Sequence, residues 1–500
     1  MSGNILFIHI NEWGQFRSSD TIPISQAYQL ASLRANGFSG RILGDYQDRP
    51  LSPSVVREAI LNDPLALGFT VYEENINRVR VWASFAKELD PELTIILGGP
   101  QITFMPGKGL LHMPEADALC RSEGETVIVE LAKALSQGHS LASVPGICIR
   151  QGEGTVETEP LPPRQDLDSI PSPYLTDIVD PTGKDSIILF TSRGCAFCYT
   201  PQASGRRIRY HSIERIAELQ HLAGKGTRDF WFTDPNFAAS RKRLVSLLTA
   251  IIEQVPGIKF WCQIRYDLMD KELAGLLQAA GAHTVAFGLE SADPEVLRRI
   301  DKRLDSEKMA EAISIVKQAG IEVELFTLFG LPGETFHQAC KTLDFVKANR
   351  VAVEGNSISQ QLYLFLGTPI SNAPEEHGIR PLPRTKPGYL SVSRDFQTTA
   401  MSKEEIRRMS VLWRLTRSDF VDDVNEGRNL FERAGFVTSN ARDLAGRPEG
   451  DVCLAKVFLN LEEYEHTAPL IDRLRTSHAE VPMVRNFLAT PFAGSPICLD

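Results

Sequence analysis

Segments with the pattern of β-strands alternate with segments of helical periodicity twice along this 500-residue chain. Parallel strands need long crossover connections, so repeated alternation predicts parallel sheets covered by helices. A chain of this length also exceeds one ordinary domain, and two alternations predict two α/β domains. The first has strand-like runs at 4–10, 66–72, 94–100 and 116–120, with helical patterns at 22–37 and 75–89.

The second alternation begins at residue 186 and predicts six strands, each followed by a helix. Six such units favour an open (βα)₆ partial TIM barrel, with functional groups at the carboxyl ends of its strands. Two of its helical patterns are 212–226 and 306–320. The predicted organisation is a Rossmann-like domain at 1–145, a linker rich in Pro, Asp and Glu at 146–185, the barrel at 186–395 and a small helical region at 396–500.

Composition narrows the classes of function. The net charge of -10 argues against a nucleic-acid binder or an anionic-membrane binder. No run of about 18 apolar residues occurs, so no membrane-spanning helix is expected. The first residues have no basic lead and predict a buried strand rather than a signal peptide. The 8 cysteines are sparse and mostly scattered, which suits a reducing cytoplasm.

The stretch "TSRGCAFCYTP" (191–201) holds the one close cysteine pair, Cys195 and Cys198. A thioredoxin-like redox motif would place such a pair at a helix N-terminus, whereas here a strand precedes it. A structural zinc site needs two more ligands at short spacing, and no second Cys-x-x-Cys or His-x₃₋₅-His follows. Two incidental thiols are the remaining alternative to a cofactor site, although loop cysteines three apart are uncommon in a cysteine-poor chain.

This stretch and the six-strand alternation resemble the radical S-adenosylmethionine (SAM) enzymes, and the N-terminal segment resembles their B12-binding branch. The resemblance covers roughly residues 1–375 and implies three cofactors: a [4Fe-4S] cluster, SAM and cobalamin. In that family a C-x₃-C-x₂-C loop supplies three thiolates and leaves one iron open for SAM. Here four residues are absent, and one of them is a cysteine. Cys198 aligns with the third family cysteine, and Cys195 aligns with the first or the second. A remote ligand such as Cys262 or His211 could substitute, although a core position is favoured for Cys262 and a helix-entry or surface position for His211.

Other barrel segments also resemble the family's SAM site. "FGLES" (287–291) places Gly288, Glu290 and Ser291 there, with Glu290 set to accept from ribose hydroxyls. Gln263 and Arg265 are predicted on one strand face, where they could meet the SAM carboxylate; an ion pair within the barrel is an equal alternative. "FTDPNF" (232–237) suits a position near the cluster or an Asp–Pro turn. "LFGLPGET" (328–335) suits close approach to adenine or substrate, or a plain tight turn.

The N-terminal motifs are similar to loops that clamp the corrin ring in this branch. "LGFTVYEENINRV" (67–79) and "TIILGGPQITFMP" (94–106) supply two loops, and "RSEGETVIVEL" (121–131) corresponds to a Gly-Glu-Gly-Glu turn. No D-x-H-x-x-G motif occurs, so that motif supplies no histidine below the cobalt, and His9 is assigned to packing or a backbone hydrogen bond. The cobalamin-binding residues that the resemblance implies are Thr70, Val71, Tyr72, Glu73, Gly98, Gly99, Pro100 and Glu123.

The resemblance implies a B12-dependent radical SAM enzyme, favouring methyl transfer to an unactivated carbon or to phosphorus of a specialised metabolite. Its expected partners are a small-molecule substrate and an electron donor such as flavodoxin or ferredoxin, with no nucleic acid and no membrane. Two alternatives follow from the shortened loop. The chain could bind cobalamin and SAM without a cluster and perform polar methyl transfer, or it could be a non-catalytic B12-binding protein.

Overall fold

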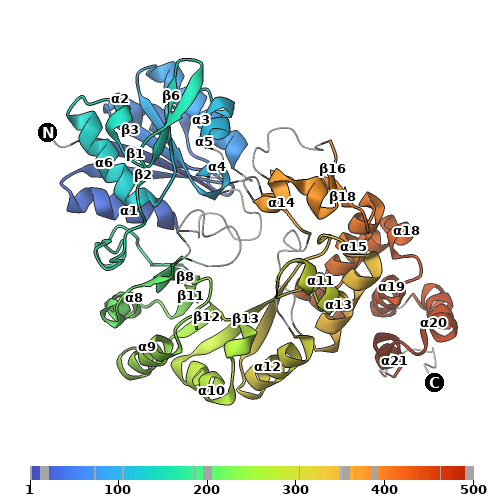
Figure 1. Ribbon diagram of the computed structural model, residues 1–500. Coiled ribbons are helices and arrows are strands. Elements are labelled where there is room, and N and C mark those ends of the chain that lie inside the picture. The colour runs from blue at the N-terminus through green and yellow to red at the C-terminus, as the bar shows by residue number, and fades with distance from the viewer. Residues whose placement is uncertain are drawn as a thin grey trace.

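The computed structural model describes most of the chain (Figure 1). The cysteine pair Cys195 and Cys198 lies outside the described residues, and so does Glu73. The described residues are 3–11, 22–72, 75–103, 106–184, 186–194, 205, 207–302, 305–349, 351, 361–365, 368–383, 392–393, 395–461 and 463–489.

The N-terminal domain is a seven-stranded sheet in the order β2-β1-β3-β4-β5-β6-β7. Its first five strands pair in parallel, and the apolar runs of β1 and β3 are buried on both faces, as in doubly wound folds. The strands are β1 (Asn4–Asn11), β2 (Ser39–Tyr46), β3 (Ala66–Thr70), β4 (Thr94–Gly98), β5 (Ala118–Cys120), β6 (Ile147–Gln151) and β7 (Gly154–Glu157).

Helices cover both faces of this sheet, which confirms the predicted Rossmann-like architecture. Leu6 and Ile8 pack on one face with Trp82 of α3, while Ile5 and Phe7 pack on the other face in the core that includes α6. The alternation of these four β1 side chains follows from the two-residue period of a strand. The helices are α1 (Ile24–Ala35), α2 (Pro53–Leu61), α3 (Ile76–Leu89), α4 (Pro100–Thr103), α5 (Pro106–His112) and α6 (Gly124–Ser136).

The predicted linker, 146–185, differs from the structure in its first part. Its first part forms the β6–β7 hairpin, which extends the N-terminal sheet antiparallel to β5 because Ile147 and Cys148 supply buried residues for that edge. Its later part has turns but no helix or strand among its described residues, yet Leu167 and Ile170 are buried against Tyr28 of α1. The later part therefore runs along the surface, as expected, and is anchored there by a few buried apolar side chains.

The second domain has a five-stranded parallel sheet in the order β14-β13-β12-β11-β8. Where the sixth predicted strand should begin, the described residues show a parallel bridge between Phe329 and Gln361, and 352–360 lie outside the described residues. Figure 1 shows helices along the outer side of this open sheet (green to yellow). The strands are β8 (Ile187–Leu189), β11 (Asp229–Phe232), β12 (Lys259–Gln263), β13 (Ala282–Glu290) and β14 (Glu322–Thr327). The helical elements are η3 (Ile213–Ile216), α8 (Ala217–Gly224), α9 (Arg241–Gln254), η4 (Tyr266–Leu268), α10 (Lys271–Ala280), α11 (Pro294–Arg299), α12 (Ser306–Gln318) and α13 (Phe336–Ala348).

The C-terminal region is helical, as predicted, and small two-stranded ladders connect it to the barrel. Trp413 of α15 is buried in the barrel's own core cluster, so these helices continue that core. Among the described helices, none is long and apolar enough to cross a membrane. The connecting elements are α14 (Pro369–Asn372), η6 (Pro374–His377), β15 (Leu364–Phe365) with β17 (Val392–Ser393), and β16 (Ile379–Pro381) with β18 (Phe396–Thr398). The helices are α15 (Lys403–Arg414), α16 (Ser418–Asn425), α17 (Leu430–Ser439), α18 (Ala441–Leu444), α19 (Pro448–Asn460), α20 (Tyr464–His478) and α21 (Pro482–Leu488).

Candidate functional site

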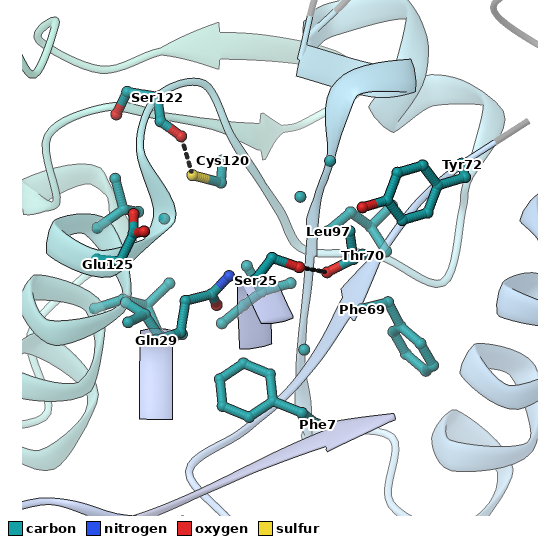
Figure 2. A pocket seen from close by; sticks show the side chains of 18 residues that line it. Phe7, Ser25, Gln29, Phe69, Thr70, Tyr72, Leu97, Cys120, Ser122 and Glu125 are labelled. Atoms are coloured by element: carbon teal, nitrogen blue, oxygen red, sulfur yellow. Dashed lines mark hydrogen bonds between the residues drawn. The ribbon is translucent and has the colours of Figure 1, made fainter. Parts of the chain in front are cut away.

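A pocket lies at the carboxyl edge of the N-terminal sheet, where α1, the β3 and β4 ends and the start of α6 meet (Figure 2). This is the edge at which doubly wound sheets bind ligands. Thr70 and Tyr72 of the predicted corrin-binding set line it, and Ser25 lies 3.4 Å from Thr70 between their hydroxyl oxygens. The Thr70–Tyr72 backbone is held by Asn75, whose side chain accepts from the Tyr72 N–H at 2.9 Å and donates to the Thr70 carbonyl at 3.0 Å.

The two glycines that end β4 line the same pocket for different reasons. A Cβ on Gly98 would meet its nearest atom at 3.8 Å, an ordinary contact, so protein packing does not require glycine there. A Cβ on Gly99 would lie 2.5 Å from the Val71 carbonyl oxygen, and its φ of 109° disfavours any side chain. Gly99 therefore shapes the turn, whereas Gly98 leaves pocket surface open. Val71 itself is buried in the core, and Pro100 begins α4.

The pocket wall is mostly neutral. The thiol of Cys120 donates to the Ser122 carbonyl at 3.2 Å, and burial raises its pKa to about 11. Cys120 is therefore a protonated thiol at neutral pH rather than a thiolate ligand. Among the described residues that line the pocket, none is a histidine. His9 lies at the β1 end with its Nδ1 3.0 Å from Gln26 Oε1, and burial lowers its pKa to about 4.

Two carboxylates at the start of α6 pair with arginines of the barrel domain. Glu123, the N-cap residue, accepts from both terminal nitrogens of Arg209, at 2.7 and 3.1 Å, instead of facing the pocket. Glu125 lines the pocket and accepts from Arg193 at 2.6 Å. Burial alone would raise the pKa of Glu125, but the Arg193 guanidinium holds that pKa below its usual range. Both carboxylates also lie in the favourable field of a helix N-terminus.

Arg193 and Arg209 mark the two ends of the loop that carries the cysteine pair. They lie opposite each other in a short antiparallel ladder formed by β9 (Ser192–Arg193) and β10 (Arg209–Tyr210). Gly194 continues the chain with a φ of 96°, and a Cβ there would lie 2.3 Å from the Arg207 carbonyl oxygen. The chain therefore enters and leaves this loop in close contact, and Cys195 follows directly in the sequence.

A buried carboxylate from the next strand fixes the base of the same loop. Asp234 of "FTDPNF" accepts from the backbone N–H of Thr191 at 3.2 and 3.1 Å, from its hydroxyl at 2.9 Å and from the hydroxyl of Ser192. Arg243 of α9 donates to the Thr191 carbonyl at 3.0 Å from the helix side. Burial raises the pKa of Asp234, which these donors oppose. Asp234 is thus an anchor for the strand end rather than only a turn residue.

The residues predicted at the SAM site are brought to the carboxyl end of β13. Glu290 ends the strand with a φ of 60° and accepts from Lys302 at 2.5 Å. A Cβ on Gly288 would lie 3.1 Å from Glu290 Oε1 and 3.2 Å from Lys302 Nζ, so glycine leaves room for that ion pair. Ser291 is fully buried, and its hydroxyl accepts from the Asp293 N–H at 3.2 Å. Glu290 is therefore the member of this set that presents a carboxylate at the strand edge, where Lys302 holds it.

Gln263 and Arg265 do not share a strand face as predicted. β12 ends at Gln263, and Arg265 lies beyond it as the residue that precedes the η4 turn. The Arg265 side chain is 62% exposed and donates to Asp267 at 2.8 Å. The strand ends early because Asn236 accepts the Arg265 N–H at 3.3 Å, in place of a neighbouring strand. Arg265 thus forms an exposed ion pair within the turn, and not the ion pair inside the barrel that the sequence left open.

The two remote residues considered as cluster ligands are held in the packed interior. Cys262 is fully buried in the barrel core, where burial raises the pKa of its thiol, so the favoured core position is confirmed. His211 lies at the entry to η3, one of the two expected positions, and is buried rather than at the surface, with Nδ1 3.0 Å from Asp168 Oδ1. Burial, aided by Arg215, lowers the His211 pKa to about 4. Within the described part of the chain, no group of three or more His, Cys, Asp or Glu side chains could hold a metal ion.

The glycine-rich turn after β14 encloses a carboxylic acid. Glu334 is fully buried and accepts the N–H groups of Gly330 at 2.8 Å and Leu331 at 3.2 Å through one oxygen. Its other oxygen has no hydrogen-bond partner among the described residues, and burial raises its pKa to about 8. Glu334 closes the turn on itself, so this turn is at least partly structural.

Comparisons with known proteins agree with this architecture. Residues 17–132 match the B12 binding domain, and residues 186–346 match the radical SAM superfamily. An uncharacterised methyltransferase of Pyrococcus horikoshii is 31% identical over 336 residues, which are 65% of this chain and 73% of that protein. The anaerobic magnesium-protoporphyrin IX monomethyl ester cyclase of Rubrivivax gelatinosus is 29% identical over 350 residues, 66% of this chain and 63% of that protein. The solved structure of OxsB, a cobalamin-dependent SAM radical enzyme, superimposes with a TM-score of 0.71 at 16% identity, covering 97% of this chain and 78% of that one.

Two α/β domains meet at the strand edges that carry these motifs, one with the B12-binding pattern and one with the radical SAM pattern. The chain belongs to the B12-binding branch of the radical SAM enzymes.

Sequence reasoning missed the residues that join the two domains. Arg193 lies in "TSRG", Arg209 in "GRRIRYH", and both glutamates in "RSEGETVIVEL". Arg193 pairs with Glu125, 68 residues away, and Arg209 pairs with Glu123, 86 residues away. No local pattern indicates either pair. A sequence signal did exist, since charged residues flank both cofactor motifs, but it does not identify the partners.

Proposed function

We propose that the protein is a cobalamin-dependent radical SAM methyltransferase that acts on an unactivated carbon or phosphorus atom of a small molecule. One observation carries the proposal: Glu125 both lines the N-terminal pocket and holds Arg193, two residues before Cys195. A cofactor in the pocket would thereby lie on the same side of the molecule as the cysteine-bearing loop. The similarity to a methyltransferase favours methylation, and the similarity to a cyclase makes ring formation the competing outcome.

The pocket fits a large, flat, mostly neutral cofactor. Gly98 leaves open surface, Thr70 and Tyr72 offer hydroxyl groups, and Cys120 stays protonated. A corrin ring would be held by Thr70, Tyr72, Gly98 and Gly99, with the Val71 and Pro100 backbones beside it; Glu73 is proposed on sequence alone. Because no described pocket-lining residue is a histidine, we propose cobalamin binding without histidine ligation. Histidine nitrogen splitting in the electron paramagnetic resonance spectrum of bound cob(II)alamin would contradict this.

The barrel edge fits SAM, and the loop cysteines are proposed as cluster ligands on sequence alone. Glu290, held by Lys302 beside Gly288, is a carboxylate acceptor suited to ribose hydroxyls. Gln263 and the exposed Arg265 are proposed for the SAM carboxylate. Ser291 is proposed to shape this edge through its buried hydroxyl. The proposed metal ligands are Cys195 and Cys198.

When bound, the cluster and SAM supply hydrogen-abstracting chemistry, and cobalamin supplies the transferable methyl group. The chain's own task is to orient these groups and exclude water. Asp234 and Arg243 hold the strand end that leads into the cysteine loop. Glu123 and Glu125 hold the two loop ends from the N-terminal domain.

We further propose a cytoplasmic location, a reduced flavodoxin or ferredoxin as electron donor, and no nucleic-acid partner.

Anaerobic reconstitution with iron, sulfide and hydroxocobalamin tests the proposal against its two alternatives. We expect about four irons per chain, 5′-deoxyadenosine release from SAM under reductant, and methylated product with a suitable substrate. Methylation of bound cobalamin without iron would support polar methyl transfer instead. Cobalamin uptake with neither activity would support a non-catalytic binding protein.

Cysteine variants sharpen the same experiment. Cys195→Ser and Cys198→Ser are each expected to abolish iron retention and 5′-deoxyadenosine release. Cys453→Ser is the matched control, because Cys453 is a buried thiol of α19 in the C-terminal region. Retained iron in both loop variants would place the ligands elsewhere.

A further inference from the structure

Four charged side chains join the wall of the N-terminal pocket to the base of the cysteine loop. We define the clamp as Glu123, Glu125, Arg193 and Arg209. We propose that the clamp residues are positioning residues. When a ligand occupies the pocket, the clamp transmits that change to the loop and sets how its two ends are aligned. This inference rests on the proposed function, because it takes cobalamin as the occupant of the pocket.

The clamp is nearly enclosed, which makes its geometry matter. The side chains of Glu123 and Arg209 are 8% and 4% exposed, and those of Glu125 and Arg193 are 11% and 14% exposed. The Glu123–Arg209 contact uses both carboxylate oxygens and both terminal nitrogens, a two-point geometry that fixes orientation as well as distance. Ion pairs with so little solvent around them are screened weakly, so a shift of one partner is transmitted to the other.

The clamp adds to the anchoring that Asp234 and Arg243 give the loop base, because the ladder at that base is weak by itself. The β9 and β10 strands have two residues each, and a ladder so short is not stable by itself. Arg193 and Arg209 are directly opposed in it, an arrangement of like charges that is unfavourable across a strand pair. Glu123 compensates by lying 2.7 Å from Arg209 and 3.7 Å from Arg193. The α6 turn therefore supplies the charge that holds the loop ends together.

The same α6 turn faces the pocket. Ser122, Gly124 and Glu125 all line it, and Gly124 is the residue between the two clamp carboxylates. Arg193 also lies over the ring of Tyr28 in α1 at 5.6 Å, so a second helix of the pocket wall contacts the clamp. A ligand that displaces or orders this turn must move or fix Glu123 and Glu125 together.

Alkylation of the loop cysteines tests the clamp in the full-length, cluster-free protein. Iodoacetamide modification of Cys195 and Cys198 is followed by mass spectrometry, with and without hydroxocobalamin. We expect saturating hydroxocobalamin to change the alkylation rate at least about fivefold in the wild-type protein, the lower end of typical coupling. The measured ratio is the alkylation rate with hydroxocobalamin divided by the rate without it. We expect this ratio to fall to about one in Arg209→Gln, because Arg209 belongs to the clamp but does not line the pocket. The ratio should also fall to about one in Glu125→Gln, and Glu125→Asp should keep part of the wild-type effect.

Controls separate the clamp from general destabilisation and from the proposed function. Arg121 lies just before the α6 turn and forms an ion pair with Glu157 of β7, outside the clamp. Arg121→Gln removes that ion pair and should leave the alkylation ratio unchanged. Absorbance titration gives the hydroxocobalamin affinity of each variant, and the thermal midpoint reports its folding. Failure of the wild-type protein to bind hydroxocobalamin would overturn the proposed function and this inference with it. Binding without any change in alkylation would overturn the clamp alone, and so would an unchanged ratio in both Arg209→Gln and Glu125→Gln.

Discussion

The carboxyl edges of the two parallel sheets are built from different chemistry. At the N-terminal edge, glycines, hydroxyl groups and a protonated thiol surround a pocket. At the barrel edge, the charged residues already have protein partners: Asp234 holds Thr191, Glu290 holds Lys302, and Arg265 holds Asp267. Among the described residues that line this pocket, Glu125 is the only charged one, and Arg193 pairs with it. The charged residues of the barrel edge pair with neighbouring residues and hold the turns there in place, because an unpaired buried charge is strongly unfavourable.

The largest expected effect lies at the barrel edge. Asp234→Asn replaces an acceptor of three donor groups by an amide that must turn one N–H toward them. We expect a loss of about 3 kcal/mol in the free energy of unfolding, measured by urea denaturation with tryptophan fluorescence. Asp229→Asn, at the opposite end of β11, is the control and should lose less than 1 kcal/mol, or about a third as much. Equal losses would mean that the barrel edge is not specially dependent on its paired charges.

A glycine pair tests the neutral edge. Gly99→Ala places a Cβ 2.5 Å from the Val71 carbonyl oxygen at a positive φ, so we expect a loss of about 2 kcal/mol in stability. Gly98→Ala, one residue earlier, should change stability by no more than about 0.5 kcal/mol. Thermal denaturation of the two variants side by side gives the comparison. Similar midpoints for both would contradict the separate roles assigned to these glycines.

The open surface at Gly98 is tested by filling it. Gly98→Leu should weaken hydroxocobalamin binding at least about tenfold, or 1.4 kcal/mol, because the added side chain projects into the pocket. Absorbance titration measures the affinity, and Gly435→Leu, at a helix position with no atom near its Cβ, serves as a control outside the pocket. Unchanged affinity in Gly98→Leu would place the corrin ring elsewhere.

The barrel edge also holds a carboxyl group without a charged partner, which gives a pH-dependent signature. Burial raises the pKa of Glu334 from 4.5 to about 8, so between these values the native state holds a proton that the unfolded state has lost. Its contribution to stability therefore decreases as pH rises through this window, by up to about 1.4 kcal/mol per pH unit. Glu334→Gln should remove that slope, as measured by urea midpoints from pH 5 to 8. Glu322→Gln, an exposed carboxylate of β14, should leave it intact. A wild-type protein with no such slope would show that Glu334 is ionised in the native state.

The smallest effect is expected at the exposed ion pair. Arg265→Gln should change the free energy of unfolding by less than about 0.5 kcal/mol, because the side chain is mostly in water. If Arg265 contacts the SAM carboxylate as proposed, SAM affinity should still fall about fivefold, as measured by calorimetry of the reconstituted protein. Arg241→Gln, which breaks another exposed pair, is the matched control. Equal SAM affinity in both variants would remove Arg265 from the proposed site.

Patterns in the sequence were enough to predict the two α/β domains and the order of their motifs. Local periodicity specifies strands and helices, and motifs such as "TIILGGP" and "FGLES" lie at strand ends, where parallel sheets present function. It also favoured a core position for Cys262, because an apolar strand residue is usually buried. It misjudged 147–157, whose hairpin depends on an edge strand far from it in the chain.

The tertiary structure alone decided how the charges are paired. Glu123 was predicted to contact a cofactor, yet its carboxylate is held by Arg209 across the domain junction. Asp234 had a turn role and a cofactor-proximal role in the sequence, and the structure makes it the anchor of Thr191 and Ser192. Helix and strand periodicity depends on neighbours a few residues away. The partner of a buried charge is whichever opposite charge the fold brings within about 3 Å, and that depends on the arrangement of the whole chain.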